Sequence, residues 1–141
     1  ALGTSLRRFG IKRILLVGIG AQSLRFGLFV LGEPTWLMGA ALSLHGFVFT
    51  YLVNGLSIAI DELSSKDNRA SAQGLMSVVR GGGGSLLGNY LAGTTYDRLA
   101  LEGGGHDWAA FFTLPALVTG VSLVIFGLLF REQHKRAAGS R

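Results

Sequence analysis

The chain has 141 residues, of which 49% are hydrophobic, 15% are charged and 22 residues are glycine. Soluble domains carry roughly 25% charged residues, so this composition excludes an ordinary soluble domain, and the absence of cysteine excludes disulfides and thiolate metal sites. The net charge of +5 comes from Lys and Arg residues that flank long apolar runs instead of forming one basic face, which predicts a multi-span membrane protein without a nucleic-acid partner.

The first predicted membrane span covers residues 14–31 and follows a basic loop at residues 1–13. Gln22 and Arg25 interrupt this span. An isolated arginine at membrane depth is costly, so we expect Arg25 to have a partner inside a helix bundle, the alternative being that it snorkels toward the surface. The chain has no initiator methionine and no signal-peptide pattern, so we expect it to be a fragment of a longer protein.

The second predicted span covers residues 36–60 and contains no charged residue. It is long enough to cross a bilayer, since about 20 apolar residues suffice. His45 and Asn54 lie inside it, and intramembrane polar groups usually face a bundle interior or a water-filled cavity. At about 100° per residue, Asn54 shares a stripe with Thr50, whereas His45 and Phe49 lie on the opposite side. Two polar faces favour a helix in the middle of a bundle, although each polar group could instead only hydrogen-bond a neighbouring helix.

Residues 75–96 form the third predicted span and residues 108–130 the fourth. The third span is rich in glycine, and Gly84 and Gly88 match a small-xxx-small pattern, so we expect this face to pack closely on another helix. Arg80 lies within about two turns of the end of the third span that adjoins the loop at residues 61–69. There its side chain either snorkels toward the membrane surface or faces the bundle interior.

The Lys and Arg residues alternate between the connections. Four precede the first span, two lie in the loop at residues 61–69, one lies at residues 97–107 and four lie in the tail at residues 131–141, while the connection between the first two spans has none. By the positive-inside rule, the first loop, the loop at residues 61–69 and the basic tail are cytoplasmic. Both ends of the chain are therefore expected on the cytoplasmic side.

Two glycine-containing stretches invite an enzyme interpretation, and neither sustains it. Residues 13–23 resemble a strand followed by a glycine turn, yet Ser23 stands where a dinucleotide fingerprint needs Gly or Ala, and no acid follows at the required distance. The glycines near Gly84 lack the Lys-Ser/Thr pair of a phosphate loop. We therefore predict no enzyme, no catalytic residue, no cofactor and no metal.

Four blocks of the sequence resemble the nucleoside:proton symporters of the major facilitator superfamily. These blocks are RFGIKR at residues 8–13, LRFGLF at 24–29, LHGFVF at 44–49 and RASAQG at 69–74, and the resemblance extends over essentially the whole chain. It implies an all-α, multi-span membrane helix bundle whose four transmembrane helices are the last four of twelve, in the C-terminal half of the transporter. The missing N-terminal helices of the same protein would then be its partners.

The resemblance implies proton-coupled uptake of nucleosides across the cytoplasmic membrane by alternating access, as a secondary active transporter. Substrate contacts in the family match His45 and Phe49 here, and Thr50 and Asn54 complete the expected substrate site. Thr50 replaces a membrane-embedded acid common in the family, which leaves proton coupling through this helix open. The charged residues expected to act inside the membrane, as ion-pair partners or gates, are Arg25, Arg80, Asp61 and Arg69.

Two alternatives to nucleoside transport stay open. The first is a membrane scaffold or sensor that kept the fold and lost transport, which Thr50 in place of the family acid favours slightly. The second is a major facilitator for another small hydroxylated solute. In each case we expect a multi-pass protein of the bacterial inner membrane, surrounded by the lipid bilayer, and for a symporter the partners are a nucleoside and protons.

Overall fold

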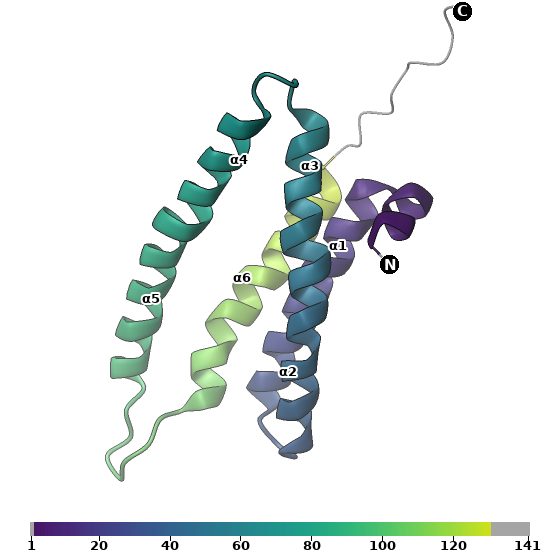
Figure 1. Ribbon diagram of the computed structural model, residues 1–141. Coiled ribbons are helices and arrows are strands. Elements are labelled where there is room, and N and C mark those ends of the chain that lie inside the picture. Colours follow the sequence, from purple (N-terminus) through teal and green to yellow (C-terminus); the bar gives the residue numbers. More distant parts are fainter. Residues whose placement is uncertain (1, 131–141) are drawn as a thin grey trace, which may run out of the picture.

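The computed structural model describes residues 2–130, and the side chains of residues 9–130, as four helical rods (Figure 1). The first rod is α1 (Leu2–Leu31). The second rod consists of α2 (Trp36–Val48), the π-helix η1 (Phe49–Asn54) and α3 (Gly55–Leu63). The third rod consists of α4 (Arg69–Ser77), the π-helix η2 (Val78–Gly84) and α5 (Ser85–Arg98). The fourth rod is α6 (Trp108–Leu129). This all-helical bundle confirms the predicted fold class.

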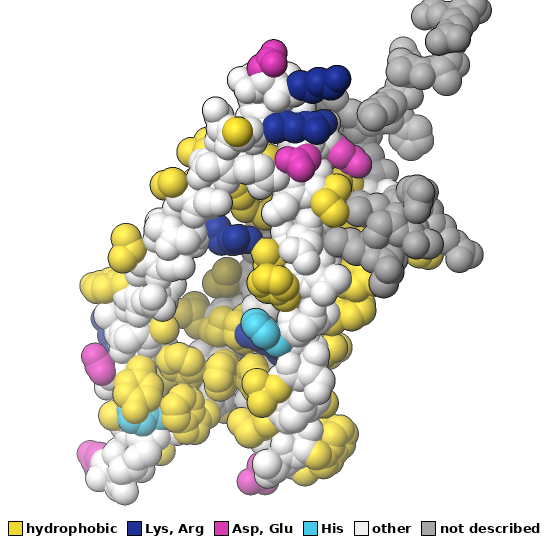
Figure 2. All heavy atoms as spheres, in the orientation of Figure 1, with side chains coloured by type: hydrophobic (Ala, Val, Ile, Leu, Met, Phe, Trp, Pro, Cys, Tyr) yellow, Lys and Arg dark blue, Asp and Glu magenta, His cyan; other side chains and the backbone are white. Residues whose placement is uncertain are grey.

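Three of the described helices are long and apolar enough to cross a membrane, namely Phe9–Leu31, Trp36–Leu63 and Trp108–Leu129. The third predicted span, at residues 75–96, is helical but is not among these three helices, because its glycines and polar side chains lower its hydropathy. Figure 2 shows that the acidic side chains lie toward the two ends of the rods, whereas basic side chains also lie midway along them. The distribution of the acidic side chains suits helices whose middle parts lie in hydrocarbon.

The basic segment before the first span is helical, so the predicted loop at residues 1–13 is wrong for residues 2–13. Helix α1 begins at Leu2 and bends at Gly10, whose φ of 77° and ψ of 163° lie outside the helical region. Glycine adopts a positive φ at little cost because it has no Cβ, and Figure 1 shows the N-terminal turns directed away from the rest of α1. The cytoplasmic location of this segment stays a prediction, and the basic tail at 131–141 lies outside the described residues.

Helix α1 is the central element of the bundle. It packs against α2, η1, α3 and α6, whereas the third rod contacts the others only through α3 and α6, next to the two loops that connect it. The third rod therefore stands apart from the other three along most of its length (Figure 1). The buried hydrophobic residues of the described chain lie in the first and second rods; they are Ile14, Leu15, Ala41, Val48 and Ala59.

Two glycines allow α1 to approach the second rod closely. A Cβ added at Gly18 would lie 2.7 Å from the backbone nitrogen of Leu52, and one added at Gly55 would lie 3.2 Å from Cγ2 of Ile14. Small residues permit this kind of approach between membrane helices. The close packing predicted for the glycines of the third span is not observed, because a Cβ at Gly88 would meet nothing within 4 Å.

Candidate functional site

Arg25 of α1 contacts His45 of α2 across the interface between the first two rods. Its Nη1 donates a hydrogen bond to Nδ1 of His45, and because a guanidinium has no acceptor, the histidine nitrogen must supply the lone pair. Neutral His45 therefore carries its proton on Nε2 in this arrangement. Figure 2 shows a histidine against a basic side chain at the edge of the opening that separates the third rod from the others.

The guanidinium of Arg25 is also held by aromatic rings. Its central carbon lies 5.1 Å from the centroid of the Phe26 ring and 5.9 Å from that of Phe29, within the range of cation–π attraction. Phe29 in turn packs on Phe112 of α6, with 4.8 Å between ring centroids. Arg25 thus has a hydrogen-bonding partner and an aromatic neighbourhood inside the bundle, and no acid takes part in either.

Two buried polar atoms beside this pair have no hydrogen-bond partner among the described residues. They are Nε of Arg25 and Oε1 of Gln22, which lies three residues earlier on the same face of α1. Leaving such a buried group unpaired costs about 1–3 kcal/mol. Gln22 was not among the residues predicted for the site, although its spacing of three from Arg25 was a signal that the two share a helix face.

The π-helix η1 changes the geometry predicted for the second rod. Phe49, Thr50 and Asn54 all lie in it, and a π turn closes hydrogen bonds five residues apart, so each residue turns by less than in an α-helix. His45 and Phe49 still share a face, because the N–H of Phe49 bonds the carbonyl of His45 with α-helical spacing. Thr50 and Asn54 also share a face, because both lie within η1 and four residues of a π-helix come close to one full turn.

The four predicted substrate residues differ in what they contact. Phe49 is 54% exposed and makes none of the aromatic ring contacts found among residues 9–130, so its ring faces are available to a ligand. His45 and Asn54 are exposed too. The hydroxyl of Thr50 donates to the carbonyl of Gly46 at 2.9 Å, which occupies it within its own helix. Only Phe49 and His45 therefore present adjacent groups on one face.

The charged residues proposed as gates are not brought together. Asp61 accepts a hydrogen bond from Nε2 of Gln73 at 2.9 Å, and the same nitrogen donates to the carbonyl of Ser57 at 2.7 Å. Gln73 thereby fastens α4 to α3 beside the loop between them. Arg69 and Arg80 are exposed, in α4 and η2 respectively, and neither forms an ion pair within the part of the chain whose side chains are described.

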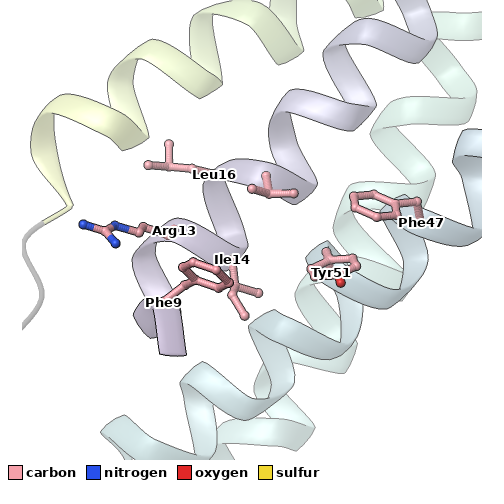
Figure 3. Close-up of a pocket in the computed structure, with 7 residues that line it drawn as sticks. Phe9, Arg13, Ile14, Leu16, Phe47 and Tyr51 are labelled. Atoms are coloured by element: carbon pink, nitrogen blue, oxygen red, sulfur yellow. The ribbon is translucent and has the colours of Figure 1, made fainter. Parts of the chain in front are cut away.

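A cavity of about 450 Å³ lies between α1 and α6, and two further cavities flank the bundle. One of about 480 Å³ lies between α1 and the second rod, where Phe9 and Ile14 face Phe47 and Tyr51 while Arg13 extends away from them (Figure 3). The other, of about 370 Å³, lies between α5 and α6, and its lining residues include Gly88, Ala92, Phe26, Phe112 and Pro115. None of these cavities is lined by His45 or Phe49, which lie on an open side of the second rod.

The described residues offer no metal centre, since no three His, Cys, Asp or Glu side chains among them lie close enough to hold an ion. Gln22, Arg25 and His45 bring polar groups to the interface between the first two rods. This arrangement can donate hydrogen bonds from a guanidinium and an imidazole, and it can exchange one proton at the imidazole. It suits the binding of a polar small molecule beside an aromatic ring.

The chain is similar to proteins whose names all describe nucleoside transporters or permeases. Residues 1–135 match the family model described as nucleoside H⁺ symporter. Among curated proteins of Escherichia coli K12, the chain is 30% identical to the putative nucleoside transporter YegT, 31% to xanthosine permease and 30% to the nucleoside permease NupG. These matches cover 94%, 92% and 93% of the chain, respectively.

A solved structure shares the fold. The crystal structure of an aspartate-to-alanine mutant of the nucleoside transporter NupG superimposes with a TM-score of 0.84 at 28% sequence identity, covering 92% of this chain. The chain spans about a third of the length of its relatives, 33% of YegT and 33% of the NupG crystal chain.

Proposed function

The chain belongs to the nucleoside H⁺ symporter family, and we propose that it forms about a third of a secondary active transporter that takes up nucleosides together with protons. The relatives are named as a putative nucleoside transporter, a xanthosine permease and a nucleoside permease, and three of the described helices are of membrane-spanning length and composition. Transport by alternating access would rock the helices described here against the helices supplied by the rest of the protein. The location would be the bacterial inner membrane, with both ends of the chain in the cytoplasm.

The observation that supports this function best is the exposed ring of Phe49 one helical turn from His45. Stacking of a nucleobase on an aromatic side chain contributes about 1–3 kcal/mol in nucleic-acid sites, and the ring of Phe49 is free for it. Because Arg25 occupies Nδ1 of His45, the imidazole offers its Nε2–H as a donor to a sugar hydroxyl. A substrate without that hydroxyl would leave the donor unpaired, which disfavours deoxy analogues.

The remaining substrate contacts would come from outside the chain. His45 and Phe49 lie on an open side of the second rod and not in a closed cavity, so a binding pocket there needs further walls. The missing helices of the same protein would supply these walls, since the relatives are about three times as long as this chain. Asn54, exposed at the far end of η1, would then line the same passage.

A second candidate function is a membrane scaffold or sensor that no longer transports. One observation favours it: Thr50, in place of the family's acid, has a hydroxyl that bonds its own helix and takes up no proton. Uptake of labelled uridine by cells that express the full-length protein, with and without a protonophore, separates the two functions. Uptake that the protonophore abolishes supports the symporter, and the absence of uptake of any nucleoside by correctly inserted protein supports the scaffold.

A further inference from the structure

We propose that His45 is a proton-binding site of this transporter and that Arg25 is its positioning residue. The inference rests on the proposed function, because it names the group that takes up the coupled proton at the substrate site. It assigns to the Arg25–His45 pair the role that Thr50 cannot perform.

The second rod contains few groups that could carry a proton through a membrane. His45 lies nine residues after Trp36, about 14 Å along the helix at about 1.5 Å per residue, and histidine is the side chain that changes charge near neutral pH. Asp61 lies close to the opposite end of the rod and is bonded to Gln73. Tyr51 stacks on Phe47, with 4.3 Å between centroids. The middle of the rod therefore has His45 as its proton acceptor.

Among the described residues, the helices around His45 contain no acid that could compensate a second positive charge. Helix α2 packs against α1 and η1, and neither of these elements, nor α6 behind α1, contains Asp or Glu. The charged group that faces His45 from α1 is Arg25, and the titratable group of η1 is Tyr51. A proton added to His45 would therefore meet one fixed neighbour, the guanidinium of Arg25.

Protonation of His45 and its bond to Arg25 exclude each other. The bond uses the lone pair of Nδ1, and a proton on Nδ1 converts this acceptor into a donor while placing two cations side by side. Arg25 stays charged throughout and must then turn away. The proton arrives on Nδ1 from one side of the membrane and leaves Nδ1 to the other, and no other bond is made or broken.

Gln22 provides the released guanidinium with another acceptor. Its Oε1 is buried and unpaired in the present arrangement, and it lies three residues from Arg25 on the same helix face. Phe26 and Phe29 stay beside the guanidinium in either position, because both belong to α1. Proton binding would thus replace the hydrogen bond from Arg25 to His45 of α2 with a hydrogen bond from Arg25 to Gln22 within α1. This exchange removes the polar link between α1 and the substrate-contacting helix α2, while their apolar packing stays.

The test uses the full-length protein reconstituted in liposomes and the variant His45→Gln. The glutamine amide oxygen can still accept a hydrogen bond from Arg25, but it takes up no proton. We expect this variant to weaken nucleoside counterflow, because His45 also contacts the substrate, and to reduce accumulation driven by a proton gradient by a larger factor, because counterflow needs no net proton movement. His106→Gln is the matched control, because His106 lies outside the apolar spans and stacks on Tyr96 at 3.6 Å; it should accumulate nucleoside like the wild type.

Accumulation of nucleoside by His45→Gln at the wild-type level would overturn the proposal while leaving the proposed function intact. Wild-type protein that shows neither counterflow nor accumulation would overturn both. If His45→Gln loses counterflow completely, the ¹⁵N signals of wild-type His45 test the proposal instead. These signals are assigned by difference from the variant. They support the proposal if Nδ1 changes protonation between about pH 5 and 8, and they overturn it if Nδ1 does not.

The role of Arg25 has its own readout in the same titration. Arg25→Leu removes the donor to Nδ1 and should shift the ¹⁵N signal of Nδ1 in neutral His45, because the lone pair loses its hydrogen bond. Leu24→Ala alters an exposed neighbour on α1, 56% exposed, and should leave that signal unchanged. Equal behaviour of the two variants would overturn the assignment of Arg25 as the positioning residue.

Discussion

Gly18 provides a quantitative test of how α1 and the second rod pack. A Cβ at this position would lie 2.7 Å from the backbone nitrogen of Leu52 and 2.9 Å from its Cα, whereas ordinary van der Waals contact begins at 3.4 Å. Gly18→Ala therefore forces the two backbones apart by roughly 0.7 Å, and overpacking costs about 1–3 kcal/mol. The higher helix preference of alanine offsets about 1 kcal/mol of this. The expected net loss is up to about 2 kcal/mol.

Gly20 is the matched control for this substitution. It lies on the same helix, and a Cβ added there meets nothing within 4 Å, so Gly20→Ala gains helix preference without a clash. Thermal unfolding of the full-length protein in detergent, followed by tryptophan fluorescence, should give a lower midpoint for Gly18→Ala than for wild type and no lower midpoint for Gly20→Ala. Equal midpoints for the two variants would refute the close approach of α1 to η1.

Three further predictions concern the site and the topology. Phe49→Ala should raise the apparent KM for uridine by about tenfold, corresponding to about 1.4 kcal/mol of lost stacking, with a milder effect for Phe49→Tyr; an unchanged KM in correctly inserted protein would mean that the substrate binds elsewhere. Arg25→Leu should lower uptake although it removes an intramembrane charge that costs about 2.5–3.5 kcal/mol to insert, and wild-type uptake would show that the arginine merely snorkels. An impermeant thiol reagent should label Gly104→Cys but not Ser65→Cys from outside intact cells, and the reverse pattern would contradict the charge-based orientation.

The arrangement of helices was accessible to sequence reasoning because it depends on long-range hydropathy. The uncharged run from Trp36 to Ile60 predicts a membrane helix without reference to neighbours, and α2, η1 and α3 occupy it. The bend at Gly10 was harder to predict, since a glycine in a basic segment is compatible with a loop as well as with a kinked helix. The third rod was also predicted to be a membrane span, but its glycines reduce its hydropathy below that of the other three.

Site geometry depended on features that a single sequence does not reveal. The cost of an arginine at membrane depth predicts that Arg25 needs a partner, but the identity of that partner, His45, follows only from the packing of α1 on α2. The π turn of η1 rotates the side chains that follow it relative to an α-helical projection, so the face that α3 presents differs from the face that a continuous α-helix predicts. Gln22 has importance only because its Oε1 is buried beside Arg25 without a partner.

The central claim, that this chain is part of a proton-coupled nucleoside transporter, is tested most directly by one reconstitution. Liposomes containing the full-length protein, with an inward proton gradient, are given labelled uridine while the internal pH is recorded. The account predicts that uridine accumulates above its external concentration, that the interior acidifies as it enters, and that a protonophore abolishes the accumulation. Equilibration of uridine without acidification, or no entry of any nucleoside by correctly inserted protein, would contradict it.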